Sequence, residues 1–119
     1  MISLHGGMSI FLCTRPTDMR KAYDGLCGEV RTYMGQDPQS GSLFVFVNRP
    51  RNRMKILVWD RHGFWLFCRR LEAGRFQQFP TTGTSCSLGY EQMVMWLEGI
   101  DLEKVRRRKR YLGIMKDNA

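Results

Sequence analysis

Short runs of strand-forming apolar residues alternate with arginine-rich turns between residues 37 and 79, and this alternation constrains the fold more than any other feature of the chain. Because the turns are too short for a crossover helix, the runs predict three antiparallel strands, near residues 43–48, 53–59 and 64–70. The first run is apolar at successive positions, so we expect it at the centre of a sheet that is covered on both faces. Such a meander would bury the aromatic side chains and place the arginines at the edges and tips of the sheet.

A helical repeat precedes these strands. Apolar residues at spacings of three and four predict a helix at about 18–34 with one buried stripe. The stripe consists of Met19, Ala22, Tyr23, Leu26, Cys27, Val30 and Met34. We expect Thr17 to cap the helix and Gly35 to end it. Gly25 and Gly28 each cost roughly 1 kcal/mol of helix propensity, which a close approach of the helix to the sheet would offset.

The remaining segments complete an α+β domain. Residues 8–13 predict a short strand, 75–79 are a candidate edge strand, 80–87 form a polar loop and 90–100 predict a second helix. We therefore expect an antiparallel sheet of three to five strands packed against an N-terminal helix, with a short C-terminal helix and a basic tail. The domain and the tail are assigned to residues 1–100 and 101–119.

The positive charge is concentrated in two places. The chain carries a formal net charge of +8. Residues 44–76 hold eight Arg or Lys against two acids, and residues 104–116 hold seven basic residues and no acid. An excess of this kind favours a polyanionic partner, which is a nucleic acid, an anionic membrane or an acidic protein surface.

The first basic cluster lies around the turn between the first two predicted strands. Its members are spaced by two, so in an extended chain their side chains point to the same side. They are Arg49, Arg51, Arg53 and Lys55. A β-ribbon presenting them would contact phosphates, or would enter a major groove and place a guanidinium group against guanine. The alternative is a solvated hairpin tip, since Pro50 interrupts the strand pattern.

The second cluster is a run of five basic residues in the tail. It consists of Arg106, Arg107, Arg108, Lys109 and Arg110. As a phosphate-binding arm the run would add affinity without discriminating between sequences. A solvated tail is the alternative, whereas membrane binding is disfavoured because no strong apolar face accompanies the charges. Arg20 and Lys21, on the polar side of the first helix, are weaker candidates because ordinary helix-surface charge explains them equally well.

The sequence contains little that indicates a catalytic or metal-binding site. The four cysteines have no spacing that fits zinc, and we expect them to be buried reduced thiols. The acidic residues form no compact motif for two-metal catalysis, and His5 and His62 have no nearby nucleophile. We therefore predict no catalytic residues, no metal, no cofactor and no small-molecule substrate. A small basic ribonuclease of the toxin type stays open as an alternative, because such an enzyme can work without histidine.

Two further expectations concern Phe44 and Phe46 and the location of the protein. The two phenylalanines would stack on bases if they lay on an exposed sheet face, but core packing is the favoured interpretation. No apolar run is long enough to cross a bilayer, and the N-terminus does not have the pattern of a signal peptide. A cytoplasmic protein is therefore expected.

Several short motifs together resemble one known family. They are Thr17 to Lys21, Asp24 to Leu26, Asp37-Pro38 with Ser40-Gly41, Leu43 to Phe46, Asn48-Arg49, Trp59-Asp60, Gly63-Phe64, Arg70 to Glu72, Gly74 to Phe76 and Leu97 to Asp101. The chain resembles the Orf2-like (TnpB) accessory proteins of the bacterial insertion-sequence-66 transposons, over roughly residues 2–101. Tyr23 and the Phe79-Pro80 pair depart from that pattern, since Phe and Trp-Pro are usual there. Both differences keep an aromatic residue.

The resemblance implies a role in transposition but no particular residues. Members of the family are encoded beside a larger transposase and have no established catalytic or binding site. We therefore expect a non-catalytic, nucleoid-associated protein that binds transposon-end DNA, the transposase of the same element, or both. The alternative is a protein-interaction adaptor whose basic surface meets an acidic face of the transposase and whose DNA affinity is nonspecific. Neutralising the hairpin arginines would change sequence preference if they read bases, whereas neutralising the tail would lower affinity uniformly.

Overall fold

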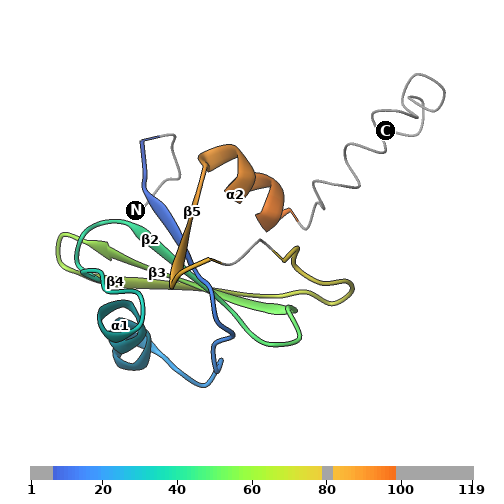
Figure 1. The fold of residues 1–119 in the computed structure, drawn as a ribbon, viewed down its shortest axis with the longest axis horizontal. Coiled ribbons are helices and arrows are strands. Elements are labelled where there is room, and N and C mark those ends of the chain that lie inside the picture. Colours follow the sequence, from blue (N-terminus) through green and yellow to red (C-terminus); the bar gives the residue numbers. More distant parts are fainter. Residues whose placement is uncertain (1–6, 79–81, 99–119) are drawn as a thin grey trace.

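The computed structural model describes residues 7–78 and 82–98, and these form one five-stranded sheet with a helix on each face (Figure 1). The elements in chain order are β1 (Ile10–Cys13), α1 (Tyr23–Thr32), β2 (Leu43–Val47), β3 (Arg53–Asp60), β4 (Gly63–Arg70), β5 (Ser85–Leu88) and α2 (Tyr90–Leu97). The strand order across the sheet is β4-β3-β2-β1-β5. The predicted α+β class and the three strands of the meander are therefore confirmed.

The sheet is mixed, whereas the sequence predicted an antiparallel one. β1 and β2 pair in parallel, with Ile10 opposite Leu43, and the other neighbouring strands pair antiparallel. The physical reason is the long connection between β1 and β2, which contains α1. A connection of this length can return the chain to the starting end of the sheet, so the next strand runs in the same direction.

Two predicted loop and strand assignments near the C-terminal side are wrong. Residues 85–87, assigned to a polar loop, belong to β5, which pairs with the open edge of β1 through Ile10 and Leu88. Residues 75–78 form no strand. Phe76 is instead buried beneath α2, with its ring centroid 5.5 Å from that of Trp96. Because the Phe76 ring packs between the sheet and α2, residues 75–78 do not pair with an edge strand.

β2 is the central strand and is covered on both faces, as predicted. Val45 and Leu43 pack into a cluster that includes Met93 and Trp96 of α2. Phe44 and Phe46 pack on the other side, in the cluster that contains the buried residues of α1. Both phenylalanines are fully buried. Their core role is confirmed, and a base-stacking role for them is excluded.

α1 is shorter than predicted and begins later. It starts at Tyr23 with Ala22 at the N-cap position, so the expected cap at Thr17 is wrong. The backbone N–H of Thr17 donates instead to the carbonyl oxygen of Val47 at 2.9 Å, which holds residue 17 at the end of β2. The buried stripe is confirmed from Leu26 onward, whereas Tyr23 is 46% exposed.

Gly28, inside α1, and Gly35, after its C-terminal end, have different structural roles. Gly35 follows α1 with a φ of 65°, in the left-handed region, and the next N–H, of Gln36, donates to the carbonyl oxygen of Val30 at 2.9 Å. Gly28 lies inside the helix, and nothing would lie within 4 Å of a Cβ atom at this position. The close approach to the sheet that was expected to explain this glycine is therefore absent.

We expect opposite effects of Ala at these two positions. Gly28→Ala should raise the free energy of unfolding by about 1 kcal/mol, because Ala has the higher helix propensity and meets no neighbour. Gly35→Ala should lower the free energy by about 1–2 kcal/mol, because an L-residue is strained at this φ. Urea unfolding of the two variants beside the parent protein measures both changes. Shifts of the same sign would contradict this assignment.

The cysteines differ in their environments. Cys13 and Cys27 are buried, and burial raises the pKa of both thiols, as expected for unreactive core residues. Cys86 is half-buried, while Cys68 is exposed, so the prediction of burial is wrong for Cys68. Cys68 lies on the edge strand β4, where one flank of the residue has no neighbouring strand.

Candidate nucleic-acid interface

Arginines from four separate segments meet at one end of the sheet. The parallel strands β1 and β2 end at the same side of the sheet, and there the antiparallel strand β3 begins and β4 ends. In Figure 1 the green β2–β3 turn and the yellow segment that follows β4 extend beyond the same end of the sheet. We call this region the arginine end, and it contains Arg15, Arg49, Arg51, Arg53, Arg69 and Arg70.

The β2–β3 turn is held firmly by its asparagines. The side-chain oxygen of Asn48 accepts the backbone N–H groups of Asn52 and Arg53, each at 3.0 Å. The side-chain amide of Asn48 also donates to the side-chain oxygen of Asn52 at 2.8 Å. Arg51 takes a φ of 59° at the tip. The guanidinium groups of Arg49 and Arg51 are therefore carried by a hydrogen-bonded turn.

The four hairpin candidates do not form one extended row. Arg49 and Arg51 belong to the turn, while Arg53 and Lys55 belong to β3 and share the face that packs on α1. The ammonium group of Lys55 donates to the carbonyl oxygen of Lys21 at 2.7 Å, which ties the strand to the segment before α1. The prediction that all four side chains point to the same side assumed an extended chain from residue 49 to residue 55. This assumption is wrong because residues 48–52 form a turn.

Two hollows flank the turn. The first, with a volume of about 350 Å³, is lined by polar groups that include Arg15, Arg49, Arg51 and Gln78, with Trp96 at one side. The second, of about 420 Å³, is lined by Met19, Arg53, Lys55, Cys68, Arg69 and Arg70. Several guanidinium groups therefore border concave surface into which a phosphate or a base edge can enter.

Acidic neighbours neutralise some of these charges. Arg15 lies over the ring of Tyr33, 3.9 Å from its centroid, and makes a bidentate contact with Glu29, whose carboxylate also accepts from Lys21 at 3.0 Å. Arg70 pairs with Glu72 at 3.0 Å. Arg20 pairs with Asp18 at 2.6 Å, and the hydrogen bonds from Arg20 lower the pKa of Asp18 to about 2.

The uncompensated charge belongs to four residues of the arginine end. Within residues 7–78 and 82–98, no ion pair involves Arg49, Arg51, Arg53 or Arg69. Arg20 and Lys21, the weaker sequence candidates, are both paired with carboxylates. The arginine end thus combines unpaired guanidinium groups, of which those of Arg49, Arg53 and Arg69 belong to exposed residues, with a hydrogen-bonded turn. Guanidinium groups without acidic partners are suited to contacts with phosphate.

Glu29 gives the protein a pH-dependent contribution to stability. Hydrogen bonds from Arg15, and then from Lys21, lower the pKa of this carboxyl group against the opposing effect of burial. A carboxyl group whose pKa is lower in the folded state stabilises the fold above its unfolded pKa. That contribution is lost as the pH falls through the folded pKa. The contribution of Glu29 is therefore present at pH 7 and decreases as the pH falls below about 4.5.

We expect Glu29→Gln to lower the free energy of unfolding at pH 7 by about 1–2 kcal/mol, because the variant cannot accept two charged donors at full strength. The difference between parent and variant should decrease as the pH falls from 7 to 3. Urea unfolding at both pH values measures it, and Asp18, which is present in both proteins, cancels from the comparison. A difference that stays constant from pH 7 to pH 3 would contradict the role of Glu29.

Other sequence predictions lie outside this surface or outside the described chain. The five basic tail residues, Arg106 to Arg110, fall beyond the described residues. Within the described ranges no group of three or more His, Cys, Asp or Glu residues is placed to hold a metal ion. Neither of the two described helices is long and apolar enough to cross a membrane.

Arg15, Arg69 and Arg70 are members of the arginine end that sequence reasoning missed. Arg69 and Arg70 lie at the end of the third predicted strand, and the antiparallel meander by itself brings that end beside the start of the second strand. The short connections between the predicted strands were therefore enough to place this part of the arginine end. No comparable signal existed for Arg15, because its position depends on the parallel pairing of β1 with β2.

The fold and this surface define a small basic α+β protein with arginines gathered at one end of its sheet. Residues 8–107 match the family described as IS66 Orf2 like protein, and the chain belongs to this family. Membership indicates an accessory protein of transposition.

Two relatives from Sinorhizobium fredii (strain NGR234) are similar over most of their length. The protein y4jC is 30% identical over 108 residues, which cover 91% of this chain and 92% of the relative. The protein y4hO is 33% identical over 92 residues, which cover 77% of this chain and 80% of the relative. No solved structure matches this chain.

Proposed function

We propose that this protein is a non-catalytic accessory factor of transposition that binds transposon DNA through the arginine end. The observation that carries the proposal is the set of unpaired guanidinium groups of Arg49, Arg51, Arg53 and Arg69 around one rigid turn. Phosphate contacts from such a surface supply affinity and orientation, and they weaken steeply as salt rises. Arg49 and Arg51, at the tip, are the residues best placed to reach a base edge in the major groove.

The basic tail would add to this surface. The described chain ends at Glu98, two residues after Trp96, and Trp96 lines the hollow that contains Arg49 and Arg51. The run from Arg106 to Arg110 begins eight positions after Glu98 in the sequence. A tail of this composition increases affinity for any duplex without adding preference for one sequence.

The test is the binding of the full-length protein to duplex DNA from the ends of its element and to a scrambled duplex of equal length, across a salt series. We expect the end sequence to be preferred near physiological salt, with both affinities falling as salt rises. Equal binding that disappears at moderate salt would instead favour the adaptor, in which the arginine end meets an acidic face of the transposase. Co-purification of the two proteins would then be measured.

The proposal that the protein is not an enzyme has its own test. Purified protein is incubated with structured and unstructured RNA, with and without a divalent metal ion, and the RNA is examined for cleavage. We expect no cleavage and no growth arrest on expression. Cleavage that disappears in an Arg49→Gln, Arg51→Gln double variant would establish the ribonuclease alternative.

A further inference from the structure

Two aromatic rings lie in the open on the edge strand β4. Trp65 and Phe67 are each 45% exposed, although a meander of this kind was expected to bury its aromatic residues. Their ring centroids are 6.1 Å apart and their planes differ by 13°, so the two rings are nearly parallel. Arg69 is the next residue of the same row, because alternate residues of a strand share a face. We call Trp65, Phe67 and Arg69 the aromatic row.

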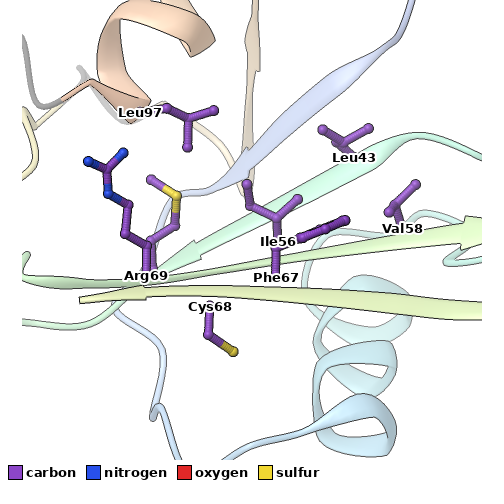
Figure 2. Close-up of a pocket in the computed structure, with 8 residues that line it drawn as sticks. Leu43, Ile56, Val58, Phe67, Cys68, Arg69 and Leu97 are labelled. Carbon is purple, nitrogen blue, oxygen red and sulfur yellow. The ribbon is translucent and has the colours of Figure 1, made fainter. Parts of the chain in front are cut away.

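The row is exposed because α2 covers only part of its face of the sheet. Val58, Ile56 and Met54, the β3 partners of the row, belong to the core cluster that contains Met93 and Trp96 of α2. Beyond them an apolar pocket of about 350 Å³ stays open, with Phe67, Arg69 and Leu97 among its lining residues. Figure 2 shows Phe67, Arg69 and Leu97 on one side of the sheet and Cys68 pointing to the other.

The indole ring of Trp65 is held in place from one side. Its Nε1 group donates to a carboxylate oxygen of Asp60 at 3.1 Å. This bond fixes the edge of the ring, so that its flat face stays available. The row therefore offers two parallel apolar faces in a defined orientation, followed by a guanidinium group for which the described residues provide no ion pair.

The charge around the row decides which partner fits it. Arg69 joins the row to the arginine end, and Arg53 and Arg70 lie directly beside it. A second copy of the chain would bring the same basic edge against this one, and like charges would repel. A duplex keeps its bases stacked inside and offers only their edges. Unpaired bases offer a π-face to aromatic rings and carry a phosphate for each base, which matches both properties of the row.

We propose that Trp65 and Phe67 form a base-stacking platform for single-stranded nucleic acid, with Arg69 binding the adjacent phosphate. The apolar pocket beside Phe67 would receive part of a base that is turned toward α2. This inference rests on the proposed function for its phosphate contacts at the arginine end. It adds that the protein recognises unpaired bases, which duplex binding alone would not require.

The experiment compares four probes of equal length: an oligothymidine strand, the same backbone without bases, an oligouridine strand and a DNA duplex. The variant Trp65→Ala, Phe67→Ala is expected to bind oligothymidine roughly 5- to 150-fold more weakly for each stacked base that is lost. Its affinity for the abasic strand and for the duplex should stay within about twofold of the parent value. Tyr23→Ala is the matched control, because Tyr23 is equally exposed but lies on α1.

The arms of the experiment separate the possible outcomes. Equal loss for oligothymidine and oligouridine would identify base stacking without a choice of sugar, and a larger loss for oligothymidine would identify DNA. The variant Trp65→Leu, Phe67→Leu keeps apolar side chains on the strand but has no aromatic face, and it should show the same loss if the alanine variant does not fold.

Unchanged oligothymidine binding in the leucine variant, or equal parental affinity for the abasic strand, would overturn the inference. Poly-glutamate serves as a fifth probe that represents an acidic protein surface. If the leucine variant loses binding to poly-glutamate while its oligothymidine binding is unchanged, the inference is overturned in favour of an acidic protein partner. The inference and the proposed function fail separately. Substitutions at Arg49 and Arg51 that leave duplex binding unchanged count against the proposed function, whereas the abasic comparison concerns the row alone.

Discussion

Replacement of Phe44 by Ala is expected to lower the free energy of unfolding by about 3–5 kcal/mol, because the change removes a fully buried ring from the central strand. The ring packs in the cluster with Leu26 and Val30 of α1, and its centroid lies 6.0 Å from that of Phe11. Since a domain of this size is stable by only about 5–15 kcal/mol, the variant should be close to unfolding at physiological temperature.

Urea unfolding followed by circular dichroism measures this loss. Phe67→Ala is the matched control, since it removes the same side chain from a position that is 45% exposed. The control should change the free energy of unfolding by less than about 1 kcal/mol. Similar losses in the two variants would mean that the central position of β2 does not determine the stability of the sheet.

The second large effect concerns DNA affinity. A triple variant with Gln at Arg49, Arg51 and Arg69 should bind duplex DNA roughly a hundredfold more weakly near 0.15 M salt, if each arginine contacts one phosphate. Each such contact contributes about 0.9 to the slope of log affinity against log salt concentration, which corresponds to roughly fivefold between about 1 M and 0.15 M salt. The slope itself should therefore decrease by about 3 in the triple variant.

A control with the same charge change separates a local surface from net charge. Gln at Arg31 together with Glu at Arg61 removes three units of positive charge from exposed positions that line neither hollow of the arginine end. Binding is measured by fluorescence anisotropy with a labelled duplex over a salt series. The control should retain most of the slope. Equal losses in these two variants, which change the net charge by the same amount, would show that net charge, rather than the arginine end, determines DNA affinity.

Much of the fold could be predicted from local patterns. The apolar runs and short turns between residues 43 and 70 allow only an antiparallel meander, because a two- or few-residue connection must reverse the chain. The unbroken apolar run of β2 required cover on both faces, and both clusters of the core pack against it. The family was also evident from short motifs, and its match covers residues 8–107.

Pairings between distant segments could not be predicted in the same way. The parallel contact of β1 with β2, and the addition of β5 to the free edge of β1, join segments that are separated by long stretches of chain. Their formation depends on which sheet edge is open and on which face each helix covers. The expected start of α1 near residue 18 was wrong for a related reason. The backbone N–H of Thr17 donates to the carbonyl oxygen of Val47 in β2, which is a contact between distant segments.

The candidate site divides along the same line. From the sequence it followed that Arg49, Arg51 and Arg53 lie around a turn and that the chain is strongly basic. The folded structure was needed to show which arginines are neutralised by acids and that Arg69 joins the surface. The exposure of Trp65 and Phe67 was likewise visible only in the folded structure. The physical reason is that exposure and charge pairing depend on neighbours brought together by folding, whereas turns and strands depend mainly on residues adjacent in the chain.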